Sequence, residues 1–331
     1  MRQEPVPTRS SALKAIPPRR HMGLGAPASP VSDSPVASPD SCFMNIITDK
    51  QCADYGMAGH PERPARILRS IEHLQQQSTV PLTWHAPVPA EPDMVARAHE
   101  PAHIRLVETS EEAFDGDTPW YPGIAAHALR SAGGAVQAMR MAREGKPTLS
   151  LLRPPGHHAT RDHAMGFCYF NSIAIASLEA RASGVRRVAV FDFDVHHGNG
   201  TEDIFRDQAG LAFYSVHQHP CYPGTGTRNV GDNCFNYPVA PATPRDSYRK
   251  VLGRALEDLK AFQPELVGVS AGFDAYARDP LAQETLEAED FKWIGAQLTA
   301  LEIPVFALLE GGYSKDLPLL IHAFLEGWSR T

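Results

Sequence analysis

The feature that most constrains the fold is a repeated alternation of short apolar runs with longer amphipathic stretches, which begins near residue 44. Apolar runs suited to buried strands occur at residues 45–48, 148–152, 187–193, 211–216, 265–270 and 305–309. Stretches with helical periodicity occur at residues 64–77, 125–144, 171–183, 245–262, 288–301 and 317–328. Because strands that alternate with helices build parallel sheets covered by helices, this pattern predicts a doubly wound α/β domain.

The beginning of the chain differs from the rest. Residues 1–41 hold eight of the 29 prolines and seven serines, with almost no apolar periodicity. Such a segment cannot bury enough apolar surface to offset the entropy of ordering, so we expect residues 1–43 to be a disordered tail. The tail lacks the apolar centre of a secretory signal, and Met44 is an alternative start. We expect residues 44–331 to form a single catalytic domain.

Composition argues against several classes of protein. Lys and Arg number 31 against 38 Asp and Glu, a net charge of −7, whereas binding to nucleic acid phosphates needs clustered positive charge. No run of about 18 apolar residues occurs, which excludes a membrane-spanning helix. The five cysteines are odd in number and lack a Cys-x-x-Cys spacing, so neither a disulfide framework nor a cysteine-based zinc site is indicated. A reducing, cytoplasmic location fits best.

Chemically active side chains follow four of the predicted strands. In open α/β sheets, ligands bind outside the carboxyl ends of the strands, where the loops converge. Histidines, carboxylates or a tyrosine, interspersed with glycines, occupy residues 153–158, 192–200, 270–274 and 310–313. Structural need alone seldom produces this pattern at four strand ends, so the sequence predicts an active site there.

Asp194 and His196 have a spacing that suits a shared metal ion, because alternate residues of an extended segment point to the same side. Asp274 follows another strand and is the candidate third ligand. One imidazole and two carboxylates leave an open position, which is typical of catalytic rather than structural zinc. An Asp-x-His pair alone is more often a hydrogen-bonded turn, and the other strand ends favour the metal.

His157 and His158 follow a rigid Pro-Pro-Gly turn and could transfer protons beside such a metal. Two neighbouring charged imidazoles would repel, so we expect their pKa values to be driven apart. Asp192 and Asn199 are candidate partners for the distal ring nitrogens. Tyr313, which follows two glycines, could donate a hydrogen bond to a developing oxyanion. A buried, hydrogen-bonded histidine pair without catalytic function is the alternative.

Five segments together resemble the zinc-dependent histone deacetylase and acetylpolyamine amidohydrolase superfamily. They are Arg-Pro-Pro-Gly-His-His-Ala at 153–159, Met-Gly-Phe-Cys-Tyr-Phe-Asn at 165–171, residues 192–201, residues 270–274, and Glu-Gly-Gly-Tyr at 310–313. The likeness extends from about residue 46 to residue 328. It implies an α/β fold of the arginase/deacetylase-like type, a three-layer α/β/α sandwich with a largely parallel central sheet.

The resemblance implies a catalytic role for each matching residue. The three predicted ligands would bind zinc. His158 would act as general base with His157 as its electrostatic partner, and Tyr313 would stabilise the tetrahedral intermediate. Asp192 would orient His157. Asn199 would lie behind His158, where nuclear relatives of the first class carry aspartate, so the chain is similar to class II members and to those of prokaryotic type.

Substrate and potassium sites are implied in the same way. Gly166 would accept the substrate amide, and Phe167 and Tyr222 would wall a narrow tunnel for an extended alkyl chain. Gly311 would be a further substrate-binding residue. A structural potassium ion would be held by Asp192, Asp194, His196, Ser215 and Val216.

We therefore expect zinc-dependent hydrolysis of N-acetyl amides, with acetyl-lysine of a protein as the first substrate hypothesis. The alternative is an acetylpolyamine or other small-molecule amidohydrolase, which would need a rim of carboxylates to hold a cation. Asp117 and Glu112 could form such a rim, although solvated loop charges explain them better. A binding module without turnover would have lost the base or Tyr313, and the sequence keeps both. Additional ligands for an arginase-like pair of manganese ions are not found.

Overall fold

Eight parallel strands form one sheet in the computed structural model, which describes residues 43–329. Their order is β2-β1-β3-β8-β7-β4-β5-β6, and each adjacent pair is parallel. The strands are β1 (Met44–Ile47), β2 (Leu82–His85), β3 (Thr148–Ser150), β4 (Val188–Asp192), β5 (Leu211–Gln218), β6 (Cys234–Val239), β7 (Leu266–Ala271) and β8 (Val305–Leu309). The tail predicted to be disordered lies outside the described residues, apart from Phe43.

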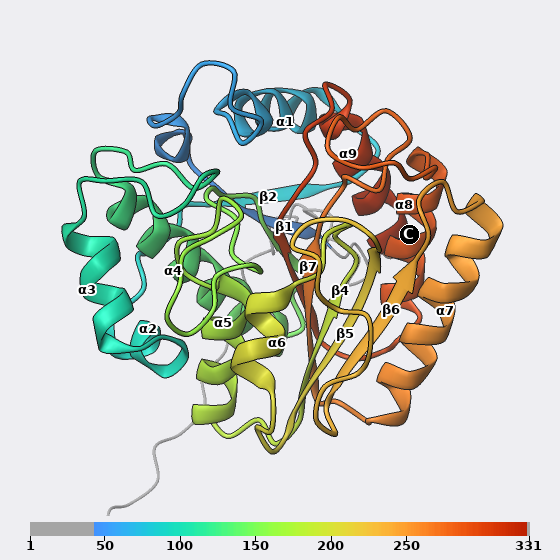
Figure 1. Cartoon of the computed structure of the whole chain (residues 1–331). Helices are drawn as coiled ribbons and strands as arrows, with labels where there is room; N and C mark the ends of the chain where they lie inside the picture. Colours follow the sequence, from blue (N-terminus) through green and yellow to red (C-terminus); the bar gives the residue numbers. More distant parts are fainter. Residues whose placement is uncertain (1–42, 330–331) are drawn as a thin grey trace, which may run out of the picture. The chain divides into compact units, whose positions relative to one another are not determined.

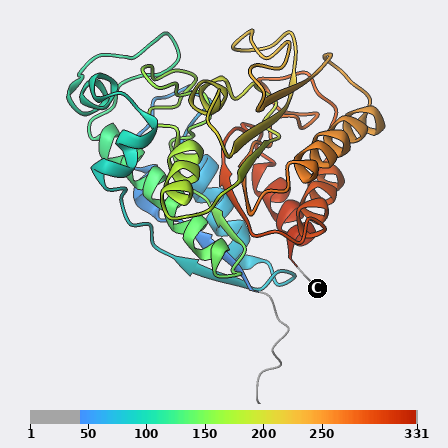
Figure 2. The same cartoon turned by 90° about the horizontal axis from the view of Figure 1, so that it is seen from below.

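Helices cover both faces of this sheet, which gives three layers (Figure 1). The helices are α1 (Ala65–Gln76), α2 (Pro92–Ala98), α3 (Pro101–Thr109), α4 (Ile124–Arg143), α5 (Ser172–Ala182), α6 (Asn199–Phe205), α7 (Arg245–Ala261), α8 (Ala288–Thr299) and α9 (Leu317–Trp328), with a short 3₁₀ helix, η1 (Lys50–Ala53). Figure 2 shows α2–α6 on one side of the sheet and α7–α9 on the other. None of these helices is long and apolar enough to span a membrane.

The strands that the sequence predicted lie in the interior of the sheet. Side chains of β1, β3, β4, β5, β7 and β8 are buried along their whole length, as expected for parallel strands covered by helices on both faces. The two edge strands, β2 and β6, were not predicted. They are only partly buried and carry polar residues, so they lack a continuous apolar run.

The order of the strands explains why the predicted site comes together. The four strands followed by chemically active segments are β3, β4, β7 and β8, and these are neighbours in the sheet. Their carboxyl ends therefore deliver their side chains to one edge of the sheet, as in other open α/β sheets.

A buried ionic cluster joins the first helix to this edge. Glu62 accepts hydrogen bonds from Arg66 at 3.1 Å and from the Nη2 of Arg153 at 2.6 Å. All three side chains are buried, and Arg66 also donates to the backbone oxygen of Gly312 at 2.8 Å. Burial would raise the pKa of Glu62, but the two guanidinium groups outweigh this effect and hold the pKa below its usual value. The cluster thus fixes both the segment after β3 and the segment after β8.

Glu62→Gln should lower the free energy of unfolding by about 3–5 kcal/mol, because it leaves two buried guanidinium groups without their counter-charge. Urea-induced unfolding measures this change. Glu144→Gln is the matched control, since Glu144 forms an exposed pair with Lys146 and should be replaced without a measurable effect. Equal stability of the Glu62→Gln variant and the wild type would contradict a structural role for the cluster.

Candidate active site

A pocket of about 200 Å³ opens at the carboxyl edge of the sheet. It brings together residues from the segments after β3, β4, β5, β7 and β8, which lie far apart in the sequence. The residues that line it are Asp117, His158, Gly166, Phe167, His196, Tyr222, Leu281 and Tyr313.

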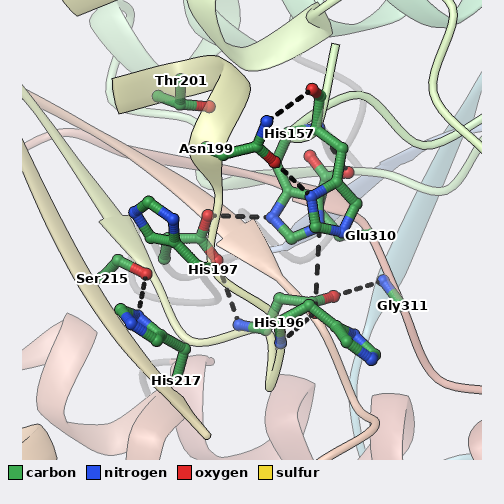
Figure 3. A network of polar contacts seen from close by, with 12 residues as sticks. His157, His196, His197, Asn199, Thr201, Ser215, His217, Glu310 and Gly311 are labelled. Carbon is green, nitrogen blue, oxygen red and sulfur yellow. Dashed lines mark hydrogen bonds and ion pairs between the residues drawn. The ribbon is translucent and has the colours of Figure 1, made fainter. Parts of the chain in front are cut away.

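The three predicted metal ligands meet at the inner end of this pocket. Nδ1 of His196 lies 3.1 Å from an oxygen of Asp194 and 3.1 Å from an oxygen of Asp274. One ligand atom from each residue lies within 4.8 Å of the others, and all three side chains are buried. Backbone N–H groups hold both carboxylates. Gly311 donates to Asp194 at 2.7 Å (Figure 3). Val195 donates to Asp274 at 2.9 Å.

The surroundings of these ligands fit a cation. Burial would lower the pKa of His196, but its hydrogen bonds to Asp194 and Asp274 raise the pKa well above its usual value. Two buried carboxylates thus require positive charge between them, which a divalent metal supplies. Gly311 must be a glycine for this geometry, since a Cβ there would lie 2.0 Å from an oxygen of Asp274. Nitrogen and oxygen ligands of this kind suit zinc and other first-row metals.

The histidine pair lies beside the ligands, and each ring has its own partner. Nδ1 of His157 lies 3.0 Å from Asp192, and Nδ1 of His158 lies 2.8 Å from the amide oxygen of Asn199. Burial would lower the pKa of His157, but Asp194 and Asp192 raise it to about 10. Burial, followed by the charges of His157 and of the neighbouring metal-ligand histidine, lowers the pKa of His158 well below its usual value. The pKa of His157 is therefore raised and that of His158 is lowered, as one charged and one neutral imidazole require.

Glu310 supports this pair from the end of β8 and was not identified as a site residue from the sequence. Its Oε2 accepts hydrogen bonds from the N–H groups of Gly156 at 2.7 Å and His157 at 3.2 Å. Burial, against the charge of His157, raises its pKa to about 7. The available signal was its position directly after a buried strand.

Tyr313 lies on the wall of the pocket. Burial raises the pKa of its hydroxyl well above the usual value, so the phenol keeps its proton and can donate a hydrogen bond. Its ring packs edge-on against Phe167, with centroids 5.8 Å apart, and lies under the guanidinium of Arg66 at 4.8 Å.

The predicted tunnel residues Gly166, Phe167 and Tyr222 all line the pocket. Gly166 has a φ of +58°, and a Cβ there would lie 2.5 Å from the ring of His158. Tyr222 contacts the same ring edge-on, with centroids 5.0 Å apart. Gly311, also predicted to bind substrate, is not among the residues that line the pocket, and its N–H holds the carboxylate of Asp194.

Asp117 differs from expectation. The sequence favoured a solvated loop charge, whereas the side chain lines the pocket. Burial, followed by its neighbour Asp115, raises its pKa. The adjacent Thr118 accepts a hydrogen bond from the N–H of Phe167 at 3.1 Å, which ties this loop to the tunnel wall. Glu112, the other candidate rim carboxylate, is exposed and does not line the pocket.

The residues of the predicted potassium site belong to the neighbouring strands β4 and β5 and to the segment that follows β4. Asp192 at the end of β4 is in register with Ser215 of β5, and both are fully buried, as is Val216. Asp192 accepts a hydrogen bond from the N–H of Asp194 at 3.1 Å. The hydroxyl of Ser215 lies 2.8 Å from Nδ1 of His217 (Figure 3).

Zinc titrated into chelator-treated protein should bind at a single site, which isothermal titration calorimetry measures. Asp274→Asn should weaken the affinity by more than the roughly 10–100-fold that loss of an orienting partner costs, because a charged ligand is removed. Asp316→Asn is the control, since Asp316 is bonded to Tyr276 and lies outside the ligand set. Unchanged affinity in the Asp274→Asn variant would exclude this ligand set.

Comparison with known proteins agrees with this geometry. The histone deacetylase domain model matches residues 60–325. A probable deacetylase of Methanothermobacter thermautotrophicus is 40% identical over 275 residues, which are 78% of this chain and 82% of that protein. A histone deacetylase-like amidohydrolase of Pseudomonas aeruginosa is 37% identical over 280 residues, 78% of this chain and 73% of that protein.

Solved structures show the same architecture. An acetylpolyamine aminohydrolase from Burkholderia pseudomallei superimposes with a TM-score of 0.79 at 26% identity, over 86% of this chain and 98% of that one. The three layers and the parallel sheet are thus those of the arginase/deacetylase-like fold. The chain belongs to the histone deacetylase domain family.

Proposed function

We propose that this chain hydrolyses the acetamide at the end of a slim, unbranched alkyl amine, with a zinc ion bound by Asp194, His196 and Asp274. The observation that supports this best is the arrangement of one charged imidazole, one neutral imidazole and one phenol around a buried set of metal ligands. When bound, the metal would polarise the amide carbonyl and lower the pKa of a water molecule.

His158 acts as the base in this proposal. Its Nδ1 faces the amide oxygen of Asn199 and therefore carries the proton, while the amide nitrogen of Asn199 is turned toward the backbone oxygen of His158 at 3.4 Å. Nε2 is then free to accept a proton from the attacking water. Burial, together with the nearby charge of His157, keeps His158 neutral before the reaction.

His157 and Tyr313 complete the proposed mechanism. His157 stays protonated against Asp192, and the histidine pair returns a proton to the amine nitrogen as the bond between carbon and nitrogen breaks. The phenol of Tyr313 donates a hydrogen bond to the carbonyl oxygen as negative charge develops on it. A preorganised donor of this kind contributes more to the transition state than to the bound substrate.

Acetyl-lysine is the first candidate substrate. Phe167 and Tyr222 leave room for an unbranched chain, and Leu281 at the mouth is 36% exposed, so it offers apolar surface to a peptide. Asp117 could accept hydrogen bonds from the peptide backbone N–H groups.

An acetylated polyamine is the second candidate, and the same Asp117 favours it. In N-acetylputrescine a free ammonium stands four carbons from the amide, where a lysine would have its Cα. Asp117 lines the pocket and has a second carboxylate, Asp115, beside it, so the rim could accept the charge of the substrate.

We also propose a potassium ion held by Asp192, Asp194, His196, Ser215 and Val216. The register that places Asp192 beside Ser215 supports it. Such an ion would brace the segment that carries two of the proposed zinc ligands, and it has no part in proton transfer.

A cytoplasmic location belongs to the same proposal. Cys52, Cys168, Cys221 and Cys234 are free thiols, as is usual in a reducing compartment.

The deciding experiment is acetate release by zinc-loaded protein from an acetyl-lysine peptide, N-acetylputrescine and N-acetylspermidine. A tenfold preference in kcat/KM, equivalent to about 1.4 kcal/mol, assigns the substrate class.

Tyr313→Phe should lower kcat by about 10²–10³-fold while zinc stays bound, because one oxyanion donor is lost. Full activity of Tyr313→Phe would overturn the proposed role of the phenol, and inactivity of the wild type on all three substrates would overturn the proposed substrates.

Asn199→Asp should move the acidic limb of the pH profile of kcat/KM to higher pH. A carboxylate at this position favours the charged imidazole and should raise the pKa of His158 by about one to three units. Since the base must be neutral, activity is then lost at a higher pH as the solution is acidified. Asn229→Asp makes the same chemical change at an exposed position and should leave the profile in place. An unmoved limb in Asn199→Asp would show that His158 does not set it.

A further inference from the structure

Asp279 is a buried carboxylate in the turn after β7, and the proposed chemistry does not use it. Its side chain is outside the pocket lining, and the residue is only 7% exposed. Its Oδ2 accepts hydrogen bonds from the N–H groups of Tyr313 at 2.7 Å and Ser314 at 3.1 Å. Its Oδ1 accepts a hydrogen bond from the N–H of Leu281 at 3.0 Å. One carboxylate thus holds the backbone of two residues that line the pocket, Tyr313 and Leu281.

The segment that carries Tyr313 needs such a restraint. It follows Gly311 and Gly312, and Gly312 has a φ of +116°, so this part of the backbone has wide conformational freedom. Asp194 and Arg66 fix the two glycines through the N–H of Gly311 and the carbonyl of Gly312. Arg66 thus holds the oxygen of the peptide group that joins Gly312 to Tyr313, whereas neither Asp194 nor Arg66 is bonded to the next peptide group, between Tyr313 and Ser314.

Asp279 binds the N–H groups of both peptide groups that flank Tyr313, so it completes the anchoring of the backbone on either side of this residue. An oxyanion donor has to be held within about 0.5 Å of its productive position to be effective. The charge of a carboxylate suits the task, because two N–H groups share one oxygen while the other oxygen binds a third.

We propose that Asp279 is the positioning residue for Tyr313, and that through Leu281 it links the mouth of the pocket to the oxyanion donor. This inference rests on the proposed function, because it gives the phenol of Tyr313 the role of donor. Asp279 does not line the pocket and is not one of the proposed metal ligands. It acts through the peptide groups that it binds.

Asp279→Asn is the most informative variant. Asparagine keeps the size and shape of the side chain but replaces one acceptor oxygen with a donor NH₂ group, which cannot bind a peptide N–H. We expect kcat to fall by about 10²-fold, as for a displacement of a reacting group by about 1 Å, with KM changed much less. Asp316→Asn is the matched control. Asp316 lies in the same segment as Tyr313, between β8 and α9. Its side chain accepts a hydrogen bond from the hydroxyl of Tyr276 at 3.1 Å and none from Tyr313 or Ser314.

A double-mutant cycle separates positioning from a general structural role. If Asp279 acts through the phenol, Asp279→Asn should lower kcat in the wild type and have no further effect in the Tyr313→Phe background. If the losses of the two variants multiply, Asp279 acts on something other than Tyr313 and the proposal is wrong. Wild-type kcat in Asp279→Asn would overturn it equally.

Amide hydrogen exchange tests the clamp without activity. In Asp279→Asn, the amides of Tyr313 and Ser314 should exchange faster, while the amide of Gly311, which is bonded to Asp194, should keep its protection. This measurement stays decisive if the wild type turns over no acetamide, so failure of the inference and failure of the proposed function are distinguishable. If Asp279→Asn does not fold, Asp279→Glu keeps the charge and displaces it by one methylene, and unchanged exchange at Tyr313 and Ser314 in that variant would reject the clamp.

Discussion

Two buried carboxylates, Asp194 and Asp274, need positive charge between them. The polar groups around them at this edge of the sheet carry positive charge or donate hydrogen bonds. Leaving charges of like sign together in a buried site is costly unless they are paired and hydrogen-bonded. His196 lies between the two carboxylates, three backbone N–H groups donate to them, and the charge of His157 lies next to Asp194. Burial, followed by the same charge, lowers the pKa of His158. The charge of His157 therefore contributes both to the charge balance of the proposed metal ligands and to the neutrality of the proposed base.

The interior of the fold could be predicted from the sequence, whereas its periphery could not. Strands buried on both faces need continuous apolar runs, and those runs are visible at β4, β7 and β8. The edge strands β2 and β6 have one free side and mixed polarity, so no such pattern marks them. Parallel pairing follows from the alternation of strands and helices, but the order of the strands does not. That order is what makes β3, β8, β7 and β4 neighbours and gathers the site.

The site shows a similar division. Residues with a proposed chemical role, such as Asp194 and His158, stand out by type and spacing after a strand. Residues that act on backbone groups stand out less, because a carboxylate bound to peptide N–H groups leaves no trace in the pattern of side chains. Glu310 is marked only by its position directly after a buried strand, and Asp279 lacks even that mark. Asp117 is a third case, since its place in the pocket depends on the path of a loop with no periodicity.

The inner end and the mouth of the pocket are thus built under different constraints. The inner end is fixed by charge balance and by contacts as short as that between Gly311 and the carboxylates, so few substitutions fit there. The mouth consists of Asp117, Leu281 and Tyr222 on loops, where a change of side chain disturbs little of the core. Asp279 connects the mouth to the wall that carries the proposed oxyanion donor. Its single carboxylate binds the N–H groups of both Leu281 and Tyr313, so the position of one residue affects the other.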